Sequence, residues 1–307
     1  MPRNSPKILV TGASGFIGQH VLARLLSENC EIHALSRCPR RTSRDGVRWW
    51  TADLTDTDQT REIVKTVAPD KIIHLASRVS GNRSADSVLP SLQNNLLSAV
   101  HLMLAAIELG NTRVILAGSM EESAPGHESQ IPISPYAAAK WAANGYARMF
   151  RSLYGLDVTT VRIAMVYGPG QMDHTKLVPY VITNLLSGNA PELGSGTRCV
   201  DWVYVEDVAA GLVRACLAEP HAPEDLNLGS GKTVSIRDVV EKLVAIGNPS
   251  IVPHFAEQRD RTLEQNWFAD TSAAEKLLGW KTETSLDSGL AKTVKWYREN
   301  LPFVKTG

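Results

Sequence analysis

The 307-residue chain has few cysteines, no net charge and no long apolar run, and each shortage excludes a class of protein. Its four cysteines stand far apart without a Cys-x-x-Cys pair, which argues against a zinc ribbon and against a secreted disulfide framework. The 32 basic and 32 acidic residues cancel, so no overall positive field attracts nucleic acid. No window reaches the roughly 18 continuous apolar residues of a membrane span, and no export signal is evident. We therefore expect a cytoplasmic protein without a nucleic-acid or membrane partner.

The first 165 residues alternate short β-branched runs with longer segments of helical period. Strands are expected at 7–10, 31–35, 47–50, 71–75, 113–117 and 157–163. Helices are expected between them, at 16–27, 56–67, 90–109 and 135–154. This alternation is typical of a parallel sheet covered on both faces. The predicted fold class is therefore α/β, with a doubly wound parallel sheet.

A glycine turn, Gly12-x-x-Gly15-x-x-Gly18, follows the first expected strand and opens the first expected helix. A side chain at either of the first two glycines would keep a pyrophosphate from the backbone N–H groups and the positive helix end. Gly18 lets the helix lie close to the strand. The turn predicts a dinucleotide site, and the alternative is a tight turn without a ligand. The expected cofactor contacts here are Gly12, Ser14, Gly15, Phe16, Ile17 and Gly18.

The second expected strand ends near Ser36 and Arg37 without the acidic residue that would bind the ribose hydroxyls of NAD. Arginines gather there instead, at positions 37, 40, 41, 44 and 48. A guanidinium grips a 2′-phosphate that a carboxylate would repel, so the stretch favours NADP(H). NAD(H) and a solvated basic loop are the alternatives. Asp53, beside Leu54, is a candidate for the adenine amino group, although Asp53 and Asp56 both also suit a helix cap.

Tyr136 and Lys140 lie one helical turn apart on the same face of the helix expected at 135–154. A nearby ammonium and a cationic nicotinamide would stabilise the tyrosine phenolate and bring its pKa toward neutral pH. Tyr-x-x-x-Lys is common by chance, but its place after the fifth expected strand and after Ser119 makes it informative. The pair predicts acid–base chemistry, and Lys140 is also a candidate for holding the nicotinamide ribose.

Several further motifs accompany this pair: residues 11–18, Ala52-Asp53-Leu54, His74-Leu75-Ala76, Asn94-Asn95, Gly118-Ser119, Tyr167-Gly168-Pro169, residues 201–207, Ala269-Asp270 and Leu278-Gly279-Trp280. With them the chain resembles, over nearly all its length, the extended short-chain dehydrogenase/reductase family, in the branch of nucleotide-sugar epimerases, 4,6-dehydratases and 4-keto-reductases. The resemblance implies that Tyr136 is the catalytic acid–base, that Lys140 is its partner and that Asn95 lies beneath the nicotinamide. It also implies cofactor contacts from Leu75 and Ala76, and a homodimer.

Beyond Gly168-Pro169-Gly170 the alternation gives way to a mixture of elements. Helices are expected at 175–187, 208–218, 236–246, 272–278 and 286–300, and strands at 199–205 and 226–228. We expect residues 1–165 to form a dinucleotide-binding Rossmann domain. Residues 166–307 are expected to form a smaller mixed α/β cap that binds a nucleotide sugar, with some segments returning to the sheet.

The chain departs from the family pattern on the substrate side. Met120 stands where a second Ser or Thr usually polarises the sugar oxygen, so either Ser119 serves instead or this donor is missing. Ser123-Ala124 replaces an aromatic–glycine pair, Met165 an asparagine and Val200 an arginine. The expected substrate contacts are Arg78, Ser80, Asn82, Met165, Val178, Arg198, Val200 and Arg261. Arg198 is a possible replacement for the missing arginine, and Arg261 is the candidate pyrophosphate clamp or a plain surface residue.

Glu121 and Glu122 leave the reaction open. In the dehydratases of this branch two acidic residues here remove water across C5 and C6, whereas some related 4-keto-reductases keep acids here without dehydrating. The pair also fits solvated loop carboxylates. His74 is expected to be a core or cofactor-edge histidine, and no metal site is expected.

The leading hypothesis is an NADPH-dependent 4-keto-sugar reductase. Hydride reaches C4 while Tyr136 protonates the incipient alkoxide, Lys140 restrains the pKa of the phenol and Ser119 orients the carbonyl. The alternative is an NAD-dependent nucleotide-sugar 4-epimerase, or a 4,6-dehydratase that uses Glu121 and Glu122. A non-catalytic dinucleotide sensor is the third hypothesis.

Overall fold

The computed structural model describes residues 5–39, 46–122, 131–219, 223–256 and 268–304. It divides into two compact units. The first unit comprises Met1–Ile163, Ala209–Asn227 and Ser272–Trp280, and the second comprises Ala164–Val208, Leu228–Thr271 and Lys281–Gly307. Among the described residues, no helix combines the length and the apolar character needed to cross a membrane.

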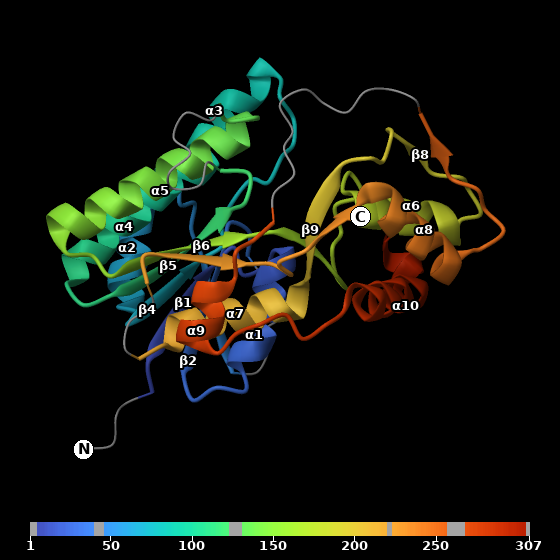
Figure 1. Ribbon diagram of the computed structural model, residues 1–307. Coiled ribbons are helices and arrows are strands. Elements are labelled where there is room, and N and C mark those ends of the chain that lie inside the picture. Colours follow the sequence, from blue (N-terminus) through green and yellow to red (C-terminus); the bar gives the residue numbers. More distant parts are fainter. Residues whose placement is uncertain (1–4, 40–45, 123–130, 220–222, 257–267, 305–307) are drawn as a thin grey trace. The chain divides into compact units, whose positions relative to one another are not determined.

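The first unit is built on a seven-stranded sheet with the strand order β10-β6-β5-β4-β1-β2-β3 (Figure 1). The strands are β1 (Lys7–Thr11), β2 (Glu31–Ser36), β3 (Val47–Thr51), β4 (Lys71–His74), β5 (Arg113–Ser119), β6 (Val158–Ile163) and β10 (Asp225–Leu228). From β3 through β1 and β4 to β6, neighbouring strands pair in parallel. The strand order reverses between β1 and β4, as in doubly wound dinucleotide-binding folds. The predicted fold class is confirmed.

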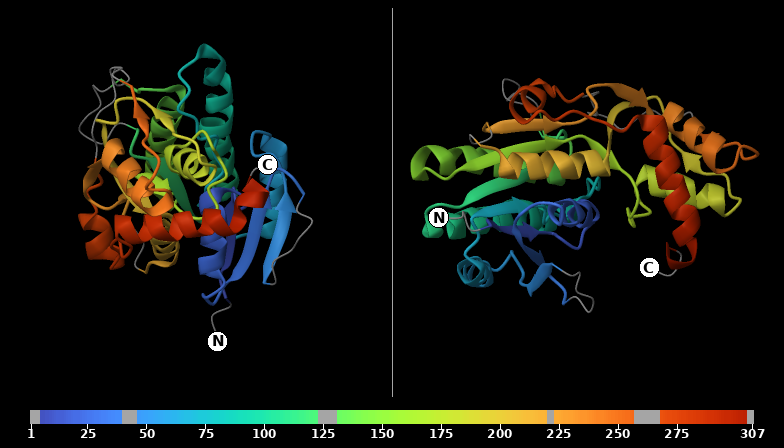
Figure 2. Two further views of the ribbon diagram at one scale, coloured as in Figure 1. Left: turned by 90° about the vertical axis from the view of Figure 1, so that its right-hand side faces the viewer. Right: turned by 90° about the horizontal axis from the view of Figure 1, so that it is seen from below.

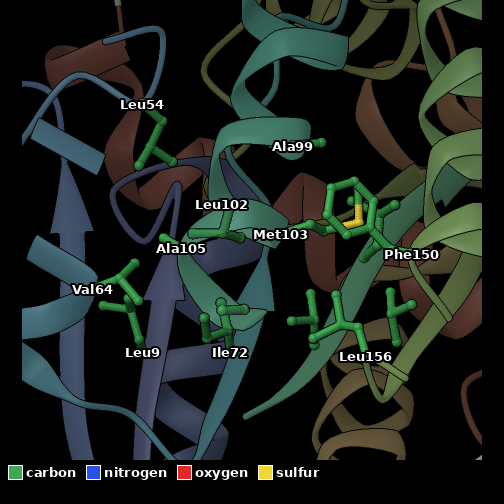
Figure 3. Packing of buried hydrophobic residues seen from close by; sticks show 14 of the residues in the cluster. Leu9, Leu54, Val64, Ile72, Ala99, Leu102, Met103, Ala105, Phe150 and Leu156 are labelled. Atoms are coloured by element: carbon green, nitrogen blue, oxygen red, sulfur yellow. The ribbon is translucent and has the colours of Figure 1, made fainter. Parts of the chain in front are cut away.

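Helices cover both faces of this sheet, as Figure 1 shows. One face carries α2 (Thr57–Val67), α4 (Ser98–Leu109) and α5 (Pro135–Tyr154), and the other carries α1 (Phe16–Leu25), most of α7 (Val205–Leu217) and α9 (Ser272–Leu278). Figure 3 shows the core on the first face, where Leu9 and Ile72 of the sheet meet Val64, Leu102 and Phe150 of the helices. Because both faces are covered, inner strands carry continuous buried apolar runs, such as Ile8 to Val10 in β1 and Val114 to Leu116 in β5.

A continuous helical segment between β4 and β5 contains one wide turn. It consists of a 3₁₀ turn (Ala85–Ser87), α3 (Val88–Ser91), a π-helical turn η2 (Leu92–Leu97) and α4. The sequence predicts a single helix at 90–109, which starts too late and omits the wide turn. Because a π turn holds an extra residue, it re-aims nearby side chains, and such turns are frequent at functional sites. Here the turn contains Asn95.

The second unit holds two small sheets, with the orders β11-β9-β7 and β12-β8. Its strands are β7 (Met165–Tyr167), β8 (Glu192–Leu193), β9 (Cys199–Tyr204), β11 (Thr233–Ser235) and β12 (His254–Phe255), and its helices are α6 (Leu177–Leu186), α8 (Ile236–Gly247) and α10 (Leu286–Val304). Both views of Figure 2 show α10, in red, along its length. Tyr167, Trp202, Tyr204 and Leu290 lie in the core of this unit. The sequence predicts β9 and the three helices but misses the other strands, which are too short to show alternation.

Thr11 and His74 connect the carboxyl ends of β1 and β4. Thr11 Oγ1 lies 2.8 Å from His74 Nδ1, and it accepts a hydrogen bond of 3.2 Å from Ala76 N–H. The His74 side chain is almost fully buried. Burial and, to a smaller extent, the charge of Lys140 lower its pKa to about 3. His74 is therefore a neutral core histidine that helps to fix the start of the loop after β4.

This neutral histidine predicts a pH-dependent stability. The unfolded chain binds a proton at this side chain below its ordinary pKa of about 6.5, while the folded protein does not. Stability contributed by the group is therefore present above about pH 6.5 and is lost as the pH falls toward the folded pKa. Between about pH 7.5 and about pH 5, we expect His74 alone to lower the free energy of unfolding by about 2 kcal/mol.

Urea unfolding at several pH values measures this loss. His74→Gln should remove that part of the pH dependence, whatever its effect on stability at neutral pH. A variant that keeps the full pH dependence of wild type would contradict the assignment.

Candidate functional site

The glycine turn between β1 and α1 leaves no room for a side chain at Gly12 or at Gly18. Gly12 has a φ of +63°, and a Cβ there would lie 2.6 Å from the backbone nitrogen of Ala76. A Cβ at Gly18 would collide with the carbonyl oxygen of Gly12 and would lie 2.8 Å from the Cα of Ala13. The backbone conformation at Gly12 and the close packing of α1 on the turn at Gly18 therefore both require glycine.

The N-terminus of α1 suits an anion. Gly15 occupies its N-cap position without a side-chain cap, and the first turn contains no acidic residue. Its first N–H groups therefore have no side-chain acceptor from the cap, and the positive end of the helix dipole lies beside the exposed Ser14 and Gly15. Phe16 and Ile17 are half-buried. Together with the glycine turn, this end of α1 fits the pyrophosphate of a dinucleotide.

The end of β2 presents one arginine of the expected group. Arg37 is exposed, and its Nη1 donates to Asn94 Oδ1 at 3.2 Å. Ser36 is buried and its hydroxyl donates to the carbonyl of Cys38. Arg48 does not belong to this group, because it lies in β3 opposite His33 and its guanidinium pairs with Glu31 at 2.8 Å. The other three, Arg40, Arg41 and Arg44, fall outside the described residues.

The two aspartates after β3 have different roles. Asp56 caps α2, since its Oδ1 accepts from the N–H groups of Asp58 and Gln59 at 2.9 and 3.0 Å. Asp53 instead accepts from the N–H and the hydroxyl of Thr55, both at 2.9 Å. Of the alternatives left open by the sequence, the cap therefore belongs to Asp56. Leu54 is buried in the core, and an adenine contact from Asp53 stays a prediction.

Asn95 holds the loop that follows β4. Its Oδ1 accepts from Ser77 Oγ at 2.9 Å and from Arg78 N–H at 2.7 Å, and its Nδ2 donates to Arg78 O at 3.1 Å. Asn95 itself is buried. The half-buried Leu75 and Ala76 precede this anchored point. Sequence reasoning did not single out Ser77, although its place directly after a buried strand is a usable signal.

Four side chains lie close together near the carboxyl end of β5: Tyr136, Ser119, Ser77 and Lys140. The Tyr136 phenol, 8% exposed, forms side-chain hydrogen bonds with Ser119 and Ser77. Lys140 Nζ lies 6.0 Å from the centre of the Tyr136 ring and donates to Ala117 O at 2.8 Å. The helix begins at the right residue for this geometry, because the Ser134 hydroxyl accepts from Ala137 N–H and Pro135 occupies the first turn.

The protein environment raises the pKa of the Tyr136 phenol. Burial is the main cause and the carboxylates of Glu121 and Glu122 add to it, while the hydrogen bonds of Ser119 and Ser77 oppose the shift. Without a bound cofactor the chain therefore does not bring the pKa of the phenol toward neutral pH, and the lowering expected from Lys140 together with a cationic nicotinamide stays a prediction. Burial also lowers the pKa of the Lys140 ammonium, and the Glu122 carboxylate opposes that change.

The two glutamates after β5 lie in different environments. The half-buried Glu121 donates its backbone N–H to Ser119 Oγ at 3.1 Å. Glu122 is 5% exposed, its Oε1 accepts from Ser119 N–H at 2.8 Å, and its Oε2 is buried without a hydrogen-bond partner. The interpretation as a solvated loop carboxylate is therefore wrong for Glu122. Met120 is half-buried and donates its N–H to Ile163 O at 3.1 Å, and Ser123-Ala124 lies outside the described residues.

The residues expected to contact substrate fall into both units. In the first unit, Arg78 and Asn82 are exposed, and Ser80 Oγ accepts from Asn82 N–H at 3.2 Å. In the second unit lie Met165, Val178, Arg198 and Val200, and Arg261 is outside the described residues. Val178 and Val200 belong to the core of the second unit, which leaves little of either side chain for a ligand. Contacts of these residues with a nucleotide sugar stay predictions.

Asp201, the first residue of the motif at 201–207, is a structural anchor of the second unit. Its buried carboxylate accepts four hydrogen bonds: from Ser230 N–H and Oγ, both at 2.7 Å, from Gly231 N–H at 3.1 Å and from Ala269 N–H at 2.9 Å. These bonds join β9 to two later loops. Across the ranges that the structure describes, no cluster of three or more His, Cys, Asp or Glu side chains could hold a metal ion.

Known proteins resemble this chain in sequence and in fold. The model of a family described as "NAD dependent epimerase/dehydratase family" matches residues 8–229. The UDP-glucose 4-epimerase of Mycolicibacterium smegmatis is 32% identical over 95% of this chain and 98% of its own length. The UDP-glucuronate 4-epimerase of Thermodesulfobacterium geofontis is 28% identical over 97% and 98%. The structure of UDP-glucose 4-epimerase from Thermotoga maritima with UDP-glucose matches with a TM-score of 0.84 and 26% identity, over 96% and 99% of the two chains.

The packing of Gly18 against the glycine turn predicts the effect of a single methyl group. Gly18→Ala should displace the turn from α1 and weaken the binding of NADH and NADPH roughly tenfold or more, because overpacking here has no flexible side chain to yield. Fluorescence titration of both nucleotides measures this.

The matched control is Gly145→Ala in α5, where a Cβ would meet nothing within 4 Å. This control should bind as wild type does. A folded Gly18→Ala protein with wild-type affinity would overturn the placement of the dinucleotide.

Proposed function

Because the chain belongs to the NAD dependent epimerase/dehydratase family of nucleotide-sugar enzymes, we propose that it transfers a hydride at C4 of a nucleoside-diphosphate sugar, with Tyr136 as its acid–base residue. The observation that carries the proposal is the buried arrangement of Tyr136, Ser119 and Lys140 behind β5. Two of the relatives described above are 4-epimerases of UDP-glucose and UDP-glucuronate, which supports the substrate class.

The residues of the first unit fit a nicotinamide dinucleotide. When bound, this cofactor donates or accepts the hydride. The turn from Gly12 to Gly18 and the N-terminus of α1 would hold its pyrophosphate, and Arg37 would bind a 2′-phosphate. Leu75 and Ala76, whose loop is fixed by Asn95, would line the cofactor site.

In the proposed reaction Tyr136 transfers its phenolic proton to the oxygen at C4 as the carbonyl is reduced. Ser119, already bonded to the phenol, would orient that carbonyl by donating its hydroxyl proton. The ammonium of Lys140, 6.0 Å from the ring, stabilises the phenolate that remains.

The finer assignment is an NADPH-dependent 4-keto-sugar reductase. Its support is the end of β2, where Ser36 and the exposed Arg37 stand in place of an acidic residue. A cofactor that dissociates after each turnover suits a net reduction of a 4-keto-6-deoxy sugar.

The second candidate is a 4-epimerase that keeps its NAD bound between turnovers. Its sequence identity to known 4-epimerases favours this candidate. A 4,6-dehydratase has less support. The carboxylate of Glu122 is buried and bonded to Ser119 N–H, so only Glu121 of the pair remains for acid–base work on a substrate.

The stoichiometry of the cofactor separates the two candidates. A reductase given UDP- or dTDP-4-keto-6-deoxyglucose should consume one NADPH for each product molecule, seen as a loss of absorbance at about 340 nm. An epimerase should convert UDP-glucose to UDP-galactose with no net absorbance change.

Under either reaction, removing the Tyr136 phenol should remove catalysis. Tyr136→Phe should lower kcat by about 10²- to 10⁴-fold while cofactor binding persists, because general acid–base catalysis contributes that much. Tyr146→Phe, on an exposed tyrosine of the same helix, is the control. Wild-type turnover of Tyr136→Phe would contradict the proposal, and unaltered biological activity of that variant would favour a dinucleotide sensor.

The choice between NADP(H) and NAD(H) is tested at Arg37. Arg37→Ala should reduce the preference for NADPH over NADH by roughly tenfold or more, because a charge-assisted hydrogen bond to the 2′-phosphate is lost. Arg48→Ala removes the same charge from a neighbouring strand, where Glu31 already pairs with it, and should leave the ratio unchanged. If wild type and Arg37→Ala had the same ratio of NADPH to NADH affinity, Arg37 would not be the residue that binds the 2′-phosphate.

We also propose a homodimer and a cytoplasmic location. Large apolar side chains are exposed on the helical segment from α3 to α4 and on the adjacent α5, among them Val88, Leu89, Leu92, Leu97, Leu104 and Leu153. Exposed apolar side chains gathered on neighbouring helices favour an interaction surface. Analytical ultracentrifugation tests the dimer, which a sedimenting mass of 33.5 kDa would contradict.

The four free cysteines support a reducing compartment such as the cytoplasm. Cell fractionation tests this location.

A further inference from the structure

The proposed reaction leaves one buried carboxyl group near its centre without a role. Glu122 lies in a cluster of charged and polar side chains on the side of the sheet that α5 covers. Within this cluster, Thr160 Oγ1 of β6 donates to Asn144 Oδ1 of α5 at 3.3 Å, and Asn144 Nδ2 lies 3.4 Å from Asp225 Oδ1 of β10. Arg162, two residues after Thr160 and so on the same face of β6, donates from Nε to Asn227 Oδ1 at 3.0 Å.

The backbone around Gly118 is shaped for the Glu122 side chain. A Cβ at Gly118 would collide with Glu122 Oε1 and would lie 3.0 Å from Thr160 Cγ2 and 3.1 Å from Arg162 Cγ. The carboxylate therefore occupies the space that any other residue at position 118 would fill. Ser119 N–H holds it there, so one residue bonds Glu122 through its backbone and Tyr136 through its hydroxyl.

The charges of this cluster are incompletely satisfied by hydrogen bonds. Glu122 Oε2 and Arg162 Nη1 are both buried without a hydrogen-bond partner. Lys140 donates to a neutral carbonyl oxygen, that of Ala117. A buried ammonium needs a nearby negative charge to remain protonated. The negative charge of Glu122 raises the pKa of Lys140, against the lowering caused by burial.

We propose that Glu122 is a positioning residue for Lys140, and that its carboxylate is the internal counter-charge that keeps the Lys140 ammonium protonated beside Tyr136. The inference deepens the proposed function, on which it rests for the role of Lys140. Glu122 has no contact with substrate in this role and acts only through the lysine.

The electrostatics of both groups support this role. Burial raises the pKa of Glu122 and lowers that of Lys140, so both titrations move toward neutral pH, and each charge opposes the shift of the other. The other groups that face Glu122 are Arg162, which lowers its pKa, and Asp225, which raises it. Removing the Glu122 charge should therefore let burial deprotonate Lys140 at a lower pH.

Direct titration of Lys140 tests the proposal. The cofactor-free protein is labelled with ¹³C-lysine, and the Lys140 signal is assigned by its loss in Lys140→Arg. Glu122→Gln keeps the shape of the side chain but removes its charge, and should lower the titration midpoint of Lys140 by about one pH unit. The alkaline limb of the kcat/KM profile should move to lower pH by the same amount.

Two further variants separate charge from structure. Gly118→Ala keeps the Glu122 carboxylate in the chain, but its added methyl group displaces that carboxylate from the space beside Gly118. This variant should therefore shift the Lys140 midpoint in the same direction. Glu108→Gln removes an exposed carboxylate of α4 that pairs with Arg61, and should leave the midpoint unchanged. Circular dichroism verifies that each protein is folded.

An unchanged Lys140 midpoint in folded Glu122→Gln would overturn the proposal, as would an equal shift in Glu108→Gln. The titration needs no substrate, so it reports on Glu122 even if Tyr136→Phe keeps full turnover and the proposed function fails. Conversely, an unchanged midpoint leaves the proposed function intact.

Discussion

The parallel pairing of β1, β4 and β5 is the constraint on which the candidate site depends. Thr11 is in register with His74, and β4 pairs with β5 in the same direction, so the three strands end at one edge. The glycine turn, the loop held by Asn95 and the stretch from Ser119 to Glu122 all begin at that edge. One ligand can contact all three segments through short loops, because the loops that follow parallel strands begin at the same edge of the sheet.

Buried charge is the second constraint on this unit. Lys140, Glu122 and Arg162 lie within the same cluster, each less than a tenth exposed. Charges in such a place are tolerated only where opposite charges and hydrogen-bond partners are arranged around them. The first unit therefore couples its folding to the electrostatics of its site, and the two cannot be varied independently.

The sequence predicts the long elements well because periodicity needs length to show. The helix Pro135–Tyr154 begins and ends where the pattern indicates, since Ser134, Pro135 and Gly155 mark its limits. The strands β7, β8, β11 and β12 escape detection because two or three residues cannot display alternation.

The site is predictable where chemistry follows motif spacing, as at Tyr136 and Lys140. It is not predictable where a side chain folds back through space. Glu122 reads as a loop carboxylate until Gly118 is seen to make room for it, and Arg48 reads as part of a basic loop until its strand pairing places it beside Glu31. Such contacts depend on the tertiary fold, which the local pattern does not contain.

The wide turn η2 lets one continuous helical segment direct its side chains toward two different places. Asn95 must point at the loop after β4, while Leu102 and Met103, a few residues on, must point into the core that the sheet forms with α2 and α5. Each residue of an ordinary helix advances the direction of its side chains by about 100°. Deleting the extra residue would therefore rotate everything beyond it by that angle, so that either the amide or the core residues would face the wrong way. In this segment the chain length itself, more than the identity of any one side chain, resists change.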